Sequence, residues 1–216
     1  MKKELSYNIG KEIREQIERP LRTRSEIILV LLKTIRMFDI SSFFPDSEQE
    51  KVYISINRMS RIFYVLKNKI FSFQFPFSIE VVDEKIRIYE RQTNIEITAT
   101  ILSVLISFFE KAKDEMFTFE DFFISIMNED DRPRDIADEQ LWEIVKNLAT
   151  YDLGYLRYDY DEKNFKQDRE KLHPINHLDI CFDQSVTFKL GLDKGMNYLA
   201  FKDMLDTTTD CMFISN

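Results

Sequence analysis

The densest grouping of metal-ligating side chains lies between residues 173 and 181. His173 and His177 are four residues apart, and Asp179 and Cys181 follow at alternate positions. Imidazole, carboxylate and thiolate groups are the donors that zinc accepts in tetrahedral sites. Pro174 breaks the helix that would align the two histidines, whereas a strand would place His177, Asp179 and Cys181 on one face. We therefore expect a strand edge with polar residues here, and neither a metal nor another cofactor.

Two other short patterns could do chemistry. The acidic run from Asn128 to Asp131 offers oxygen ligands but lacks the spacing and central glycine of a calcium loop, so we interpret it as a solvated loop. Gly191 and Gly195 have GxxxG spacing outside any long apolar segment, which predicts a turn. The sequence contains no GxxxxGK[ST], GxGxxG or GxSxG pattern. We predict that the chain is not an enzyme.

Composition predicts a folded protein of one large or two small domains. The 216 residues are 44% hydrophobic and include only four glycines and five prolines, which leaves little room for flexible linkers. Cys181 and Cys211 are too few and too far apart for a disulfide scaffold, so we expect free thiols. No apolar stretch approaches the roughly 18 residues of a membrane span, and we expect a cytoplasmic protein without a membrane partner.

The C-terminal half has the clearer pattern of secondary structure. Apolar residues recur at helical spacing in Thr98 to Lys113, in a shorter segment from Phe119 to Met127, and in Asp138 to Thr150. Gly154 can close the last of these helices. Alternating residues then predict a strand at Tyr155 to Tyr160 and a returning pair within His177 to Leu190, with a turn near Asp183. This order of three helices and a hairpin is typical of a winged-helix domain.

A similar order is less regular in the N-terminal half. Ser25 to Phe38 predicts an opening helix, and Ser47 to Ile70 predicts one long helix or two short ones. Phe77 to Val82 and Lys85 to Tyr89 predict a hairpin around Asp83 and Glu84. Leu5 to Arg19, with isoleucine at every fourth position, predicts an additional amphipathic helix.

The predicted fold class is therefore α+β and mostly helical, with two winged-helix domains in tandem and an extra N-terminal helix. The predicted domains are residues 1–94, which hold the N-terminal helix and first winged helix, and residues 95–201, which form the second winged helix. Residues 202–216 are predicted to be a C-terminal tail.

Charge bears on whether such domains would bind DNA. Residues 1–75 hold 14 Lys and Arg against 9 Asp and Glu, a net +5, whereas residues 76–216 have 16 against 29, a net −13. The acidic part disfavours direct DNA binding. In the basic part, possible phosphate contacts are Arg22, Arg24, Arg58, Arg61, Lys67 and Lys69. The alternative is a solvated face paired with nearby glutamates.

Two groups of residues could instead face a protein. Phe71, Phe73 and Phe75 alternate with polar residues and need cover, either from a core, from a seam between the domains, or from a partner. Glu139, Trp142 and Glu143 lie on the helix that a DNA-reading winged helix would place in the major groove, yet this helix is acidic. We therefore expect that helix to face protein, with Trp142 as a boundary or a core residue.

The run from Ser78 through Phe122 resembles the central part of MukE-type subunits of bacterial condensins. The hairpin SIEVVDEKIRIYER, the helix TNIEITATILSVLISFFEKAKD and the segment FTFEDFF carry the resemblance, and DICFDQSVTFKLG resembles the closing strand of that family. The resemblance covers about half of the chain and leaves out Met1 to Phe44 and Lys202 to Asn216. It implies an acidic, often dimeric, tandem winged-helix subunit that binds the kleisin subunit of an SMC ATPase complex. Related subunits occur in plasmid-defence condensins.

The leading hypothesis is a non-catalytic accessory subunit that binds a kleisin-like partner and, through it, an SMC-like ATPase acting on DNA in condensation or in plasmid or phage defence. A homodimer is expected, with DNA contacted indirectly or weakly. One alternative is a DNA-binding winged-helix regulator that uses the basic first domain. Another is the middle subunit of a different ATPase-based defence system.

Overall fold

The computed structural model describes residues 4–38, 50–56, 59–83, 85–112, 120, 124, 136–163, 165, 172–181 and 187–213. Contacts divide the chain into two compact units, each built from separated stretches of sequence. The sheet unit consists of Met1–Asn8, Pro45–Phe75 and Leu153–Asn216. The helical unit consists of Ile9–Phe44 and Pro76–Asp152. The predicted domains 1–94, 95–201 and 202–216 were each continuous, whereas these units interleave along the chain.

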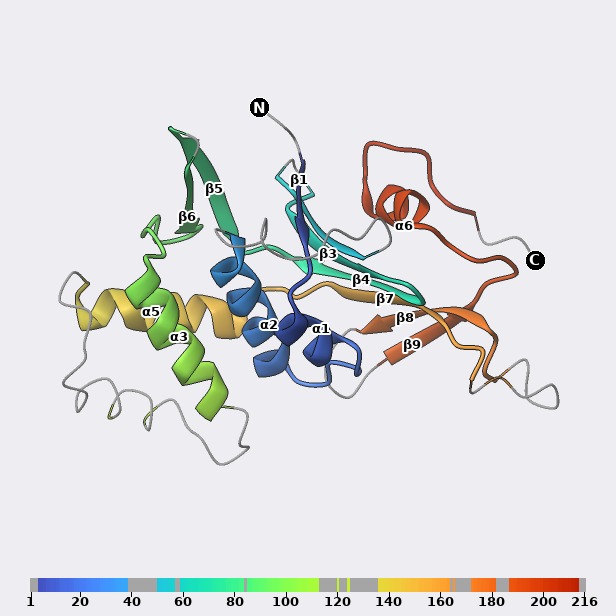
Figure 1. The fold of residues 1–216 in the computed structure, drawn as a ribbon, viewed down its shortest axis with the longest axis horizontal. Coiled ribbons are helices and arrows are strands. Elements are labelled where there is room, and N and C mark those ends of the chain that lie inside the picture. Colours follow the sequence, from blue (N-terminus) through green and yellow to red (C-terminus); the bar gives the residue numbers. More distant parts are fainter. Residues whose placement is uncertain are drawn as a thin grey trace. The chain divides into compact units, whose positions relative to one another are not determined.

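The sheet unit is built on seven antiparallel strands in the order β1-β2-β3-β4-β7-β8-β9 (Figure 1). All seven strands follow one another along the sheet in sequence order, and two neighbouring pairs, β1 with β2 and β4 with β7, are separated by long stretches of chain. The strands are β1 (Glu4–Asn8), β2 (Lys51–Ser55), β3 (Arg61–Leu66), β4 (Lys69–Gln74), β7 (Tyr155–Tyr160), β8 (Asn176–Cys181) and β9 (Thr187–Gly191).

The helix predicted from Ser47 to Ile70 is wrong, because the described part of this segment forms β2, β3 and the start of β4. Strands β3 and β4 are buried on both faces, and in β3 every residue after Arg61 is apolar or aromatic, so the run includes matches to a helical spacing. The β-branched and aromatic residues favour extended backbone over helix. The helix predicted from Leu5 to Arg19 is also wrong in its first part, where β1 pairs with β2.

Helix α6 (Tyr198–Leu205) covers one face of the sheet (Figure 1). Phe201 is fully buried there against Phe63 and a cluster of strand residues from β4, β7 and β8. Tyr198 stacks on Tyr53 of β2 with ring centroids 4.2 Å apart, and its hydroxyl donates to Glu4 Oε2 at 2.8 Å. The segment predicted as a tail therefore includes half of a helix that completes the core of the sheet unit.

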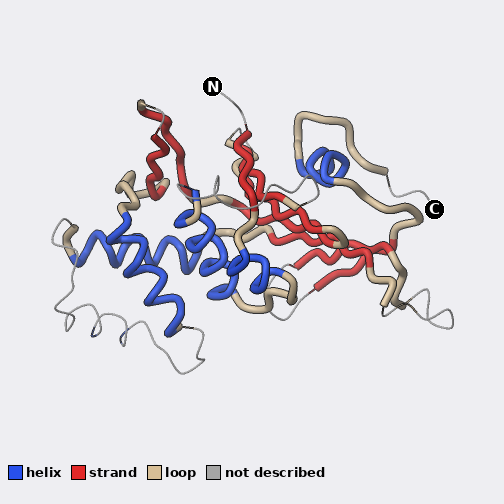
Figure 2. Tube along the Cα trace, in the orientation of Figure 1, coloured by secondary structure: helices blue, strands red, loops and turns tan. Residues whose placement is uncertain are grey.

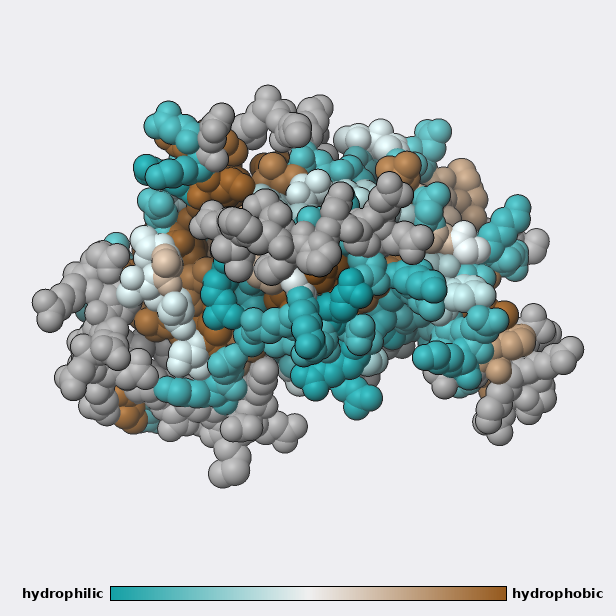
Figure 3. Space-filling model, in the orientation of Figure 1, coloured by the Kyte–Doolittle hydropathy of each residue, from teal (hydrophilic) through white to brown (hydrophobic). Residues whose placement is uncertain are grey.

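The helical unit contains α1 (Lys11–Ile17), α2 (Arg24–Arg36), α3 (Ala99–Lys111), α5 (Asp138–Thr150) and a separate hairpin of β5 (Phe77–Val82) and β6 (Lys85–Glu90) (Figure 2). Helix α2 begins with a capping box between Thr23 and Glu26 and is buried on all sides from Ile27 to Ile35, whereas α3 buries one apolar stripe. Lys33 of α2 pairs with Glu12 of α1 at 3.1 Å and with Glu110 of α3 at 2.8 Å. Figure 3 shows apolar side chains over the hairpin, where Val81 and Val82 are exposed.

Several predicted elements are confirmed. The hairpin around residue 83, the helices α2, α3 and α5, and the strands β7, β8 and β9 lie close to their predicted positions. The second helix predicted at Phe119 to Met127 lies outside the described residues, except for Glu120 and Ile124.

The tandem winged-helix, mostly helical fold is nevertheless wrong. Nine strands and five helices occur among the described residues, and seven of those strands form one sheet. The strands predicted as the second wing, β7 to β9, extend this sheet and belong to a different compact unit from α3 and α5. Within the described ranges, no helix is both long enough and apolar enough to cross a membrane.

A buried carboxylate organises the turn after β6. Glu90 is 1% exposed, and its carboxylate accepts from the backbone amides of Gln92 and Thr93 at 3.1 and 2.8 Å. The Thr93 hydroxyl donates at 2.8 Å, and Asn147 Nδ2 of α5 donates at 3.1 Å. These donors compensate the loss of hydration of the charged group and tie the hairpin to α5.

Tyr198 predicts a loss of stability in alkali. Burial raises the pKa of its phenol, and the hydrogen bond to Glu4 raises it further. Because the folded pKa exceeds the unfolded value of about 10, this contribution to stability is complete below that pH and is lost as pH rises above it. We expect urea midpoints measured at pH 8 and pH 11 to differ less for Tyr198→Phe than for the wild type. An equal difference in the two proteins would show that Tyr198 does not contribute.

Asn147→Asp would place a second carboxylate within hydrogen-bond distance of Glu90. At an effective dielectric constant of about 20, this repulsion is on the order of 3 kcal/mol at neutral pH. We expect the free energy of unfolding to fall at pH 7 and to recover partly at pH 4, where one carboxyl can be protonated. Asn147→Ala serves as the control, since it removes the hydrogen bond without adding charge. A pH-independent loss in Asn147→Asp would contradict this account.

Candidate functional site

Charged side chains gather on one face of the sheet unit at strands β7, β8 and β9. Cross-strand register places Arg157 opposite Asp179, Asp179 opposite Lys189, and Asp159 opposite His177. Residues directly opposite in an antiparallel pair share a face and lie close enough to interact. We call these five residues the polar cluster.

Arg157 is the centre of the polar cluster. Its Nε contacts Asp159 Oδ2 at 2.5 Å, and its Nη2 donates to Asp179 Oδ2. Lys189 Nζ lies 3.9 Å from the other oxygen of Asp179. His177 Nδ1 is 3.0 Å from the Pro174 carbonyl, and its Nε2 is 3.7 Å from Asp159 Oδ2. The two carboxylates are therefore matched by two permanent cations.

Electrostatics make the charged side chains of this cluster an ion-pair network. Burial lowers the pKa of the Arg157 guanidinium, but the attraction of Asp159 and Asp179 outweighs it and raises that pKa above its usual range. The guanidinium thus stays charged at every pH where the protein folds. Its pairing with Asp179 links β7 to β8, whereas its pairing with Asp159 lies within β7.

Of the predicted grouping of His173, His177, Asp179 and Cys181, the structure describes the first three side chains and brings only His177 and Asp179 together. His177 and Asp179 share a face as predicted for a strand, but they meet Asp159 of β7, and His173 is exposed. One ligand atom from each of Asp159, His177 and Asp179 lies within 4.8 Å of the others, so these three could hold a cation. Arg157 already binds both carboxylates, however, and a divalent ion would be repelled by it.

Strand β9 forms one edge of the sheet. All five of its residues are exposed, and among the described residues no strand pairs with its outer side. Phe188 is 56% exposed and Leu190 is 37% exposed, on the face that also carries Leu178 and Ile180 of β8. Large apolar side chains on an open edge are a feature that proteins usually avoid unless the edge binds something.

Hydrogen bonding shows which backbone groups β9 presents outward. The Leu192 amide donates to the Asn176 carbonyl at 2.9 Å. Leu192 and Asn176 are therefore a hydrogen-bonded pair, and such pairs occur at every second position of an antiparallel ladder. It follows that Leu190 and Phe188, two and four residues earlier, also direct their amides and carbonyls at β8. The groups directed at the outer edge are those of Thr187, Lys189 and Gly191.

The predicted phosphate-contacting residues do not form one patch in either unit. Arg24 donates to the Tyr151 carbonyl at 2.6 Å within the helical unit, where Arg22 is exposed. Arg61 is buried in the sheet unit, and its guanidinium donates to Ser72 and to the Gly154 carbonyl. Lys67 is exposed and Lys69 half-buried at the β3–β4 turn, while Arg58 lies outside the described residues.

Predicted partner-facing residues have two different environments. Phe71, Phe73 and Phe75 are 1%, 0% and 2% exposed, so they form core and offer no surface to a partner. Glu139, Trp142 and Glu143 lie on the face of α5 opposite its buried stripe, and Glu143 pairs with Lys146 at 2.6 Å. Trp142 is half-buried there, which differs from the core burial that the sequence favoured and fits the alternative of a boundary residue.

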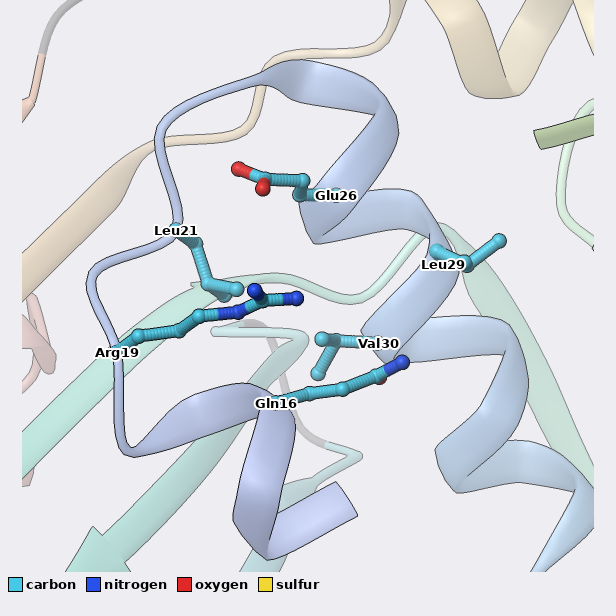
Figure 4. A pocket seen from close by; sticks show the side chains of 6 residues that line it. All are labelled: Gln16, Arg19, Leu21, Glu26, Leu29 and Val30. Carbon is cyan, nitrogen blue, oxygen red and sulfur yellow. The ribbon is translucent and has the colours of Figure 1, made fainter. Parts of the chain in front are cut away.

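Two hollows lie within the helical unit. One of about 190 Å³ is bounded by α2, β6 and α3, and polar and apolar groups line it about equally. Its arginines are matched, since Arg87 pairs with Glu96 at 3.9 Å and Arg36 with Glu12 at 3.3 Å. The other, near Gln16 and Val30, measures about 10 Å³, and Arg19 reaches across it (Figure 4). That space suits about one water molecule, enough to satisfy the buried Gln16 Oε1.

Sequence reasoning identified His177 and Asp179 but missed Arg157, Asp159 and Lys189. A signal was present, because Arg157 and Asp159 alternate with Leu156, Tyr158 and Tyr160. Charged residues at alternate positions of a strand predict a polar face. Register between β7, β8 and β9 could not be read from the sequence.

No protein-family model, curated protein or solved structure matches the chain.

Arg157→Met would leave the carboxylates of Asp159 and Asp179 buried without their main counter-charge. Removing one member of such a network costs about 3–5 kcal/mol of unfolding free energy. The matched control combines Arg157→Met with Asp159→Asn and Asp179→Asn, which removes the uncompensated charge, and we expect it to be more stable than the single variant. Denaturant titration measures both. A loss below about 1 kcal/mol in Arg157→Met would show that the cluster is not a stabilising network.

Proposed function

We propose that this chain is a non-catalytic subunit that binds a partner protein, and that the partner adds an extended segment to the outer edge of β9. The observation that carries the proposal is the exposure of the whole of β9 together with Phe188 and Leu190. Strand addition satisfies outward amides and carbonyls in pairs and buries alternate side chains, so it supplies both affinity and specificity.

The resemblance to MukE-type subunits suggests who the partner is. The segment that carries it, Ser78 through Phe122, includes the β5–β6 hairpin and α3. The fold that the resemblance implied is not the fold of this chain, so the support is the sequence pattern alone. On that support the proposed partner is a kleisin-like protein of an SMC-like ATPase complex. The complex would act on DNA in the cytoplasm, with two copies of this chain and with DNA contacted mainly through the partner.

Polar surfaces elsewhere fit this proposal better than direct DNA binding. Arg24 and Arg61 are engaged by backbone carbonyls, and the candidate basic residues are divided between the two units. Phosphate binding requires cations free to replace counterions along one surface.

The test is co-expression with the proteins encoded beside this chain, purification through this chain, and mass measurement of the intact complex. We expect a partner to co-purify with the wild type and at least tenfold less with Phe188→Ser combined with Leu190→Ser. The matched control is Val81→Ser combined with Leu199→Ser, which replaces two apolar side chains that are 52% and 70% exposed on other elements.

Equal recovery of the partner in both double variants would contradict binding at β9. Purification of the wild-type chain with no other protein, together with salt-sensitive binding to duplex DNA, would overturn the proposed function in favour of a DNA-binding regulator.

A further inference from the structure

The polar face at β7 to β9 forms a row of alternating charge that ends at the open edge of the sheet. Arg157 on β7 lies directly opposite Asp179 on β8, and Asp179 lies directly opposite Lys189 on β9. The row therefore runs positive, negative, positive, and its last member is 37% exposed at the edge. A strand added to β9 would place its own side chain beside Lys189.

The opposite face of the same strands forms an apolar row. Leu178 and Ile180 of β8 pair with Leu190 and Phe188 of β9, and Leu178 belongs to the core cluster under α6. Both β9 side chains remain exposed because β9 has no further neighbour among the described strands. An added strand with apolar residues at the two flanking positions would continue this row and bury it.

We infer that β9 receives an extended partner segment with the pattern apolar–acidic–apolar, in which the acidic side chain lies opposite Lys189 and the apolar ones lie beside Phe188 and Leu190. The inference rests on the proposed function and specifies the partner's chemistry. The pattern reads the same in both directions, so it fits a parallel or an antiparallel segment.

A second copy of this chain fits the edge less well. The outward groups belong to Thr187, Lys189 and Gly191, so the two-fold register that uses the whole of β9 pairs Lys189 with its own equivalent. Like charges directly opposite are destabilising. Registers that avoid this contact leave part of β9 unpaired. A homodimer formed through another surface is compatible with the inference.

The test uses two fluorescein-labelled peptides, acetyl-Ser-Thr-Val-Glu-Val-Thr-Ser-amide and the same peptide with Lys in place of Glu, titrated with the full chain at low salt. An opposite-charge cross-strand pair predicts roughly two- to fivefold tighter binding of the Glu peptide. The variant Lys189→Glu should reverse this preference. Amide hydrogen exchange should slow at Lys189 and Gly191 when the Glu peptide binds.

Lys189→Pro separates strand addition from simple charge attraction. Proline keeps the ladder with β8 but removes both the outward amide and the lysine charge, so the matched control is Lys189→Ala, which removes the charge alone. We expect Lys189→Pro to fold yet bind either peptide at least tenfold more weakly than Lys189→Ala does. Circular dichroism and thermal unfolding check that it folds. If it does not fold, the reversal of preference in Lys189→Glu and the exchange data decide the matter.

Each of the following results would overturn the inference: no binding of the Glu peptide, equal binding of the two peptides, no reversal in Lys189→Glu, or unchanged binding in a folded Lys189→Pro. A wild-type dimer that Lys189→Pro dissociates would show that β9 pairs with a second copy. If a partner co-purifies through Phe188 and Leu190 while the peptides show no charge preference, the proposed function stands and the inference fails.

Discussion

Pairing of β4 with β7 is the constraint on which the rest of the structure depends. Residues 69–74 and 155–160 are adjacent in the sheet although the chain between them builds most of the helical unit. Without this pairing, β1 to β4 and β7 to β9 would be two small sheets with open central edges. Arg61 reinforces the join, since its guanidinium binds Ser72 of β4 and the Gly154 carbonyl just before β7. Gly154 has φ of +50° there, which glycine adopts without strain.

Local patterns predicted those elements whose periodicity is unambiguous. Helices α3 and α5 bury a single stripe each, and the β5–β6 hairpin alternates strictly, so their sequences allowed one interpretation. Strands β3 and β4 did not, because burial on both faces removes the alternation that distinguishes a strand from a helix. Because these strands were interpreted as a helix, the predicted fold was a winged helix and not one continuous sheet. The pairing of β4 with β7 was also missed, since two strands about 80 residues apart leave no trace of their pairing in local periodicity.

The candidate site was also predictable only in its local features. A strand at residues 177–181 correctly placed His177 and Asp179 on one face, but the partner strand decided their chemistry. Arg157 binds the carboxylates that a metal ion would need as ligands. Nothing in the spacing of residues 173–181 indicated that an arginine of another strand would lie beside them. Likewise, alternation of Phe71, Phe73 and Phe75 predicted a need for cover, and only the fold showed that the protein's own core supplies it.

Lys189 also affects what happens to copies of this chain that lack a partner. An open strand flanked by Phe188 and Leu190 is a template for uncontrolled stacking into fibres, the hazard that sheet proteins meet by placing lysine on their edges. Here a single ammonium group in the middle of β9 opposes stacking of identical chains while it leaves the edge open to an acidic strand. Solubility of the isolated chain and selection of the proposed partner would then depend on the same charge, and a cell that produced the chain in excess would rely on that charge to keep it dispersed.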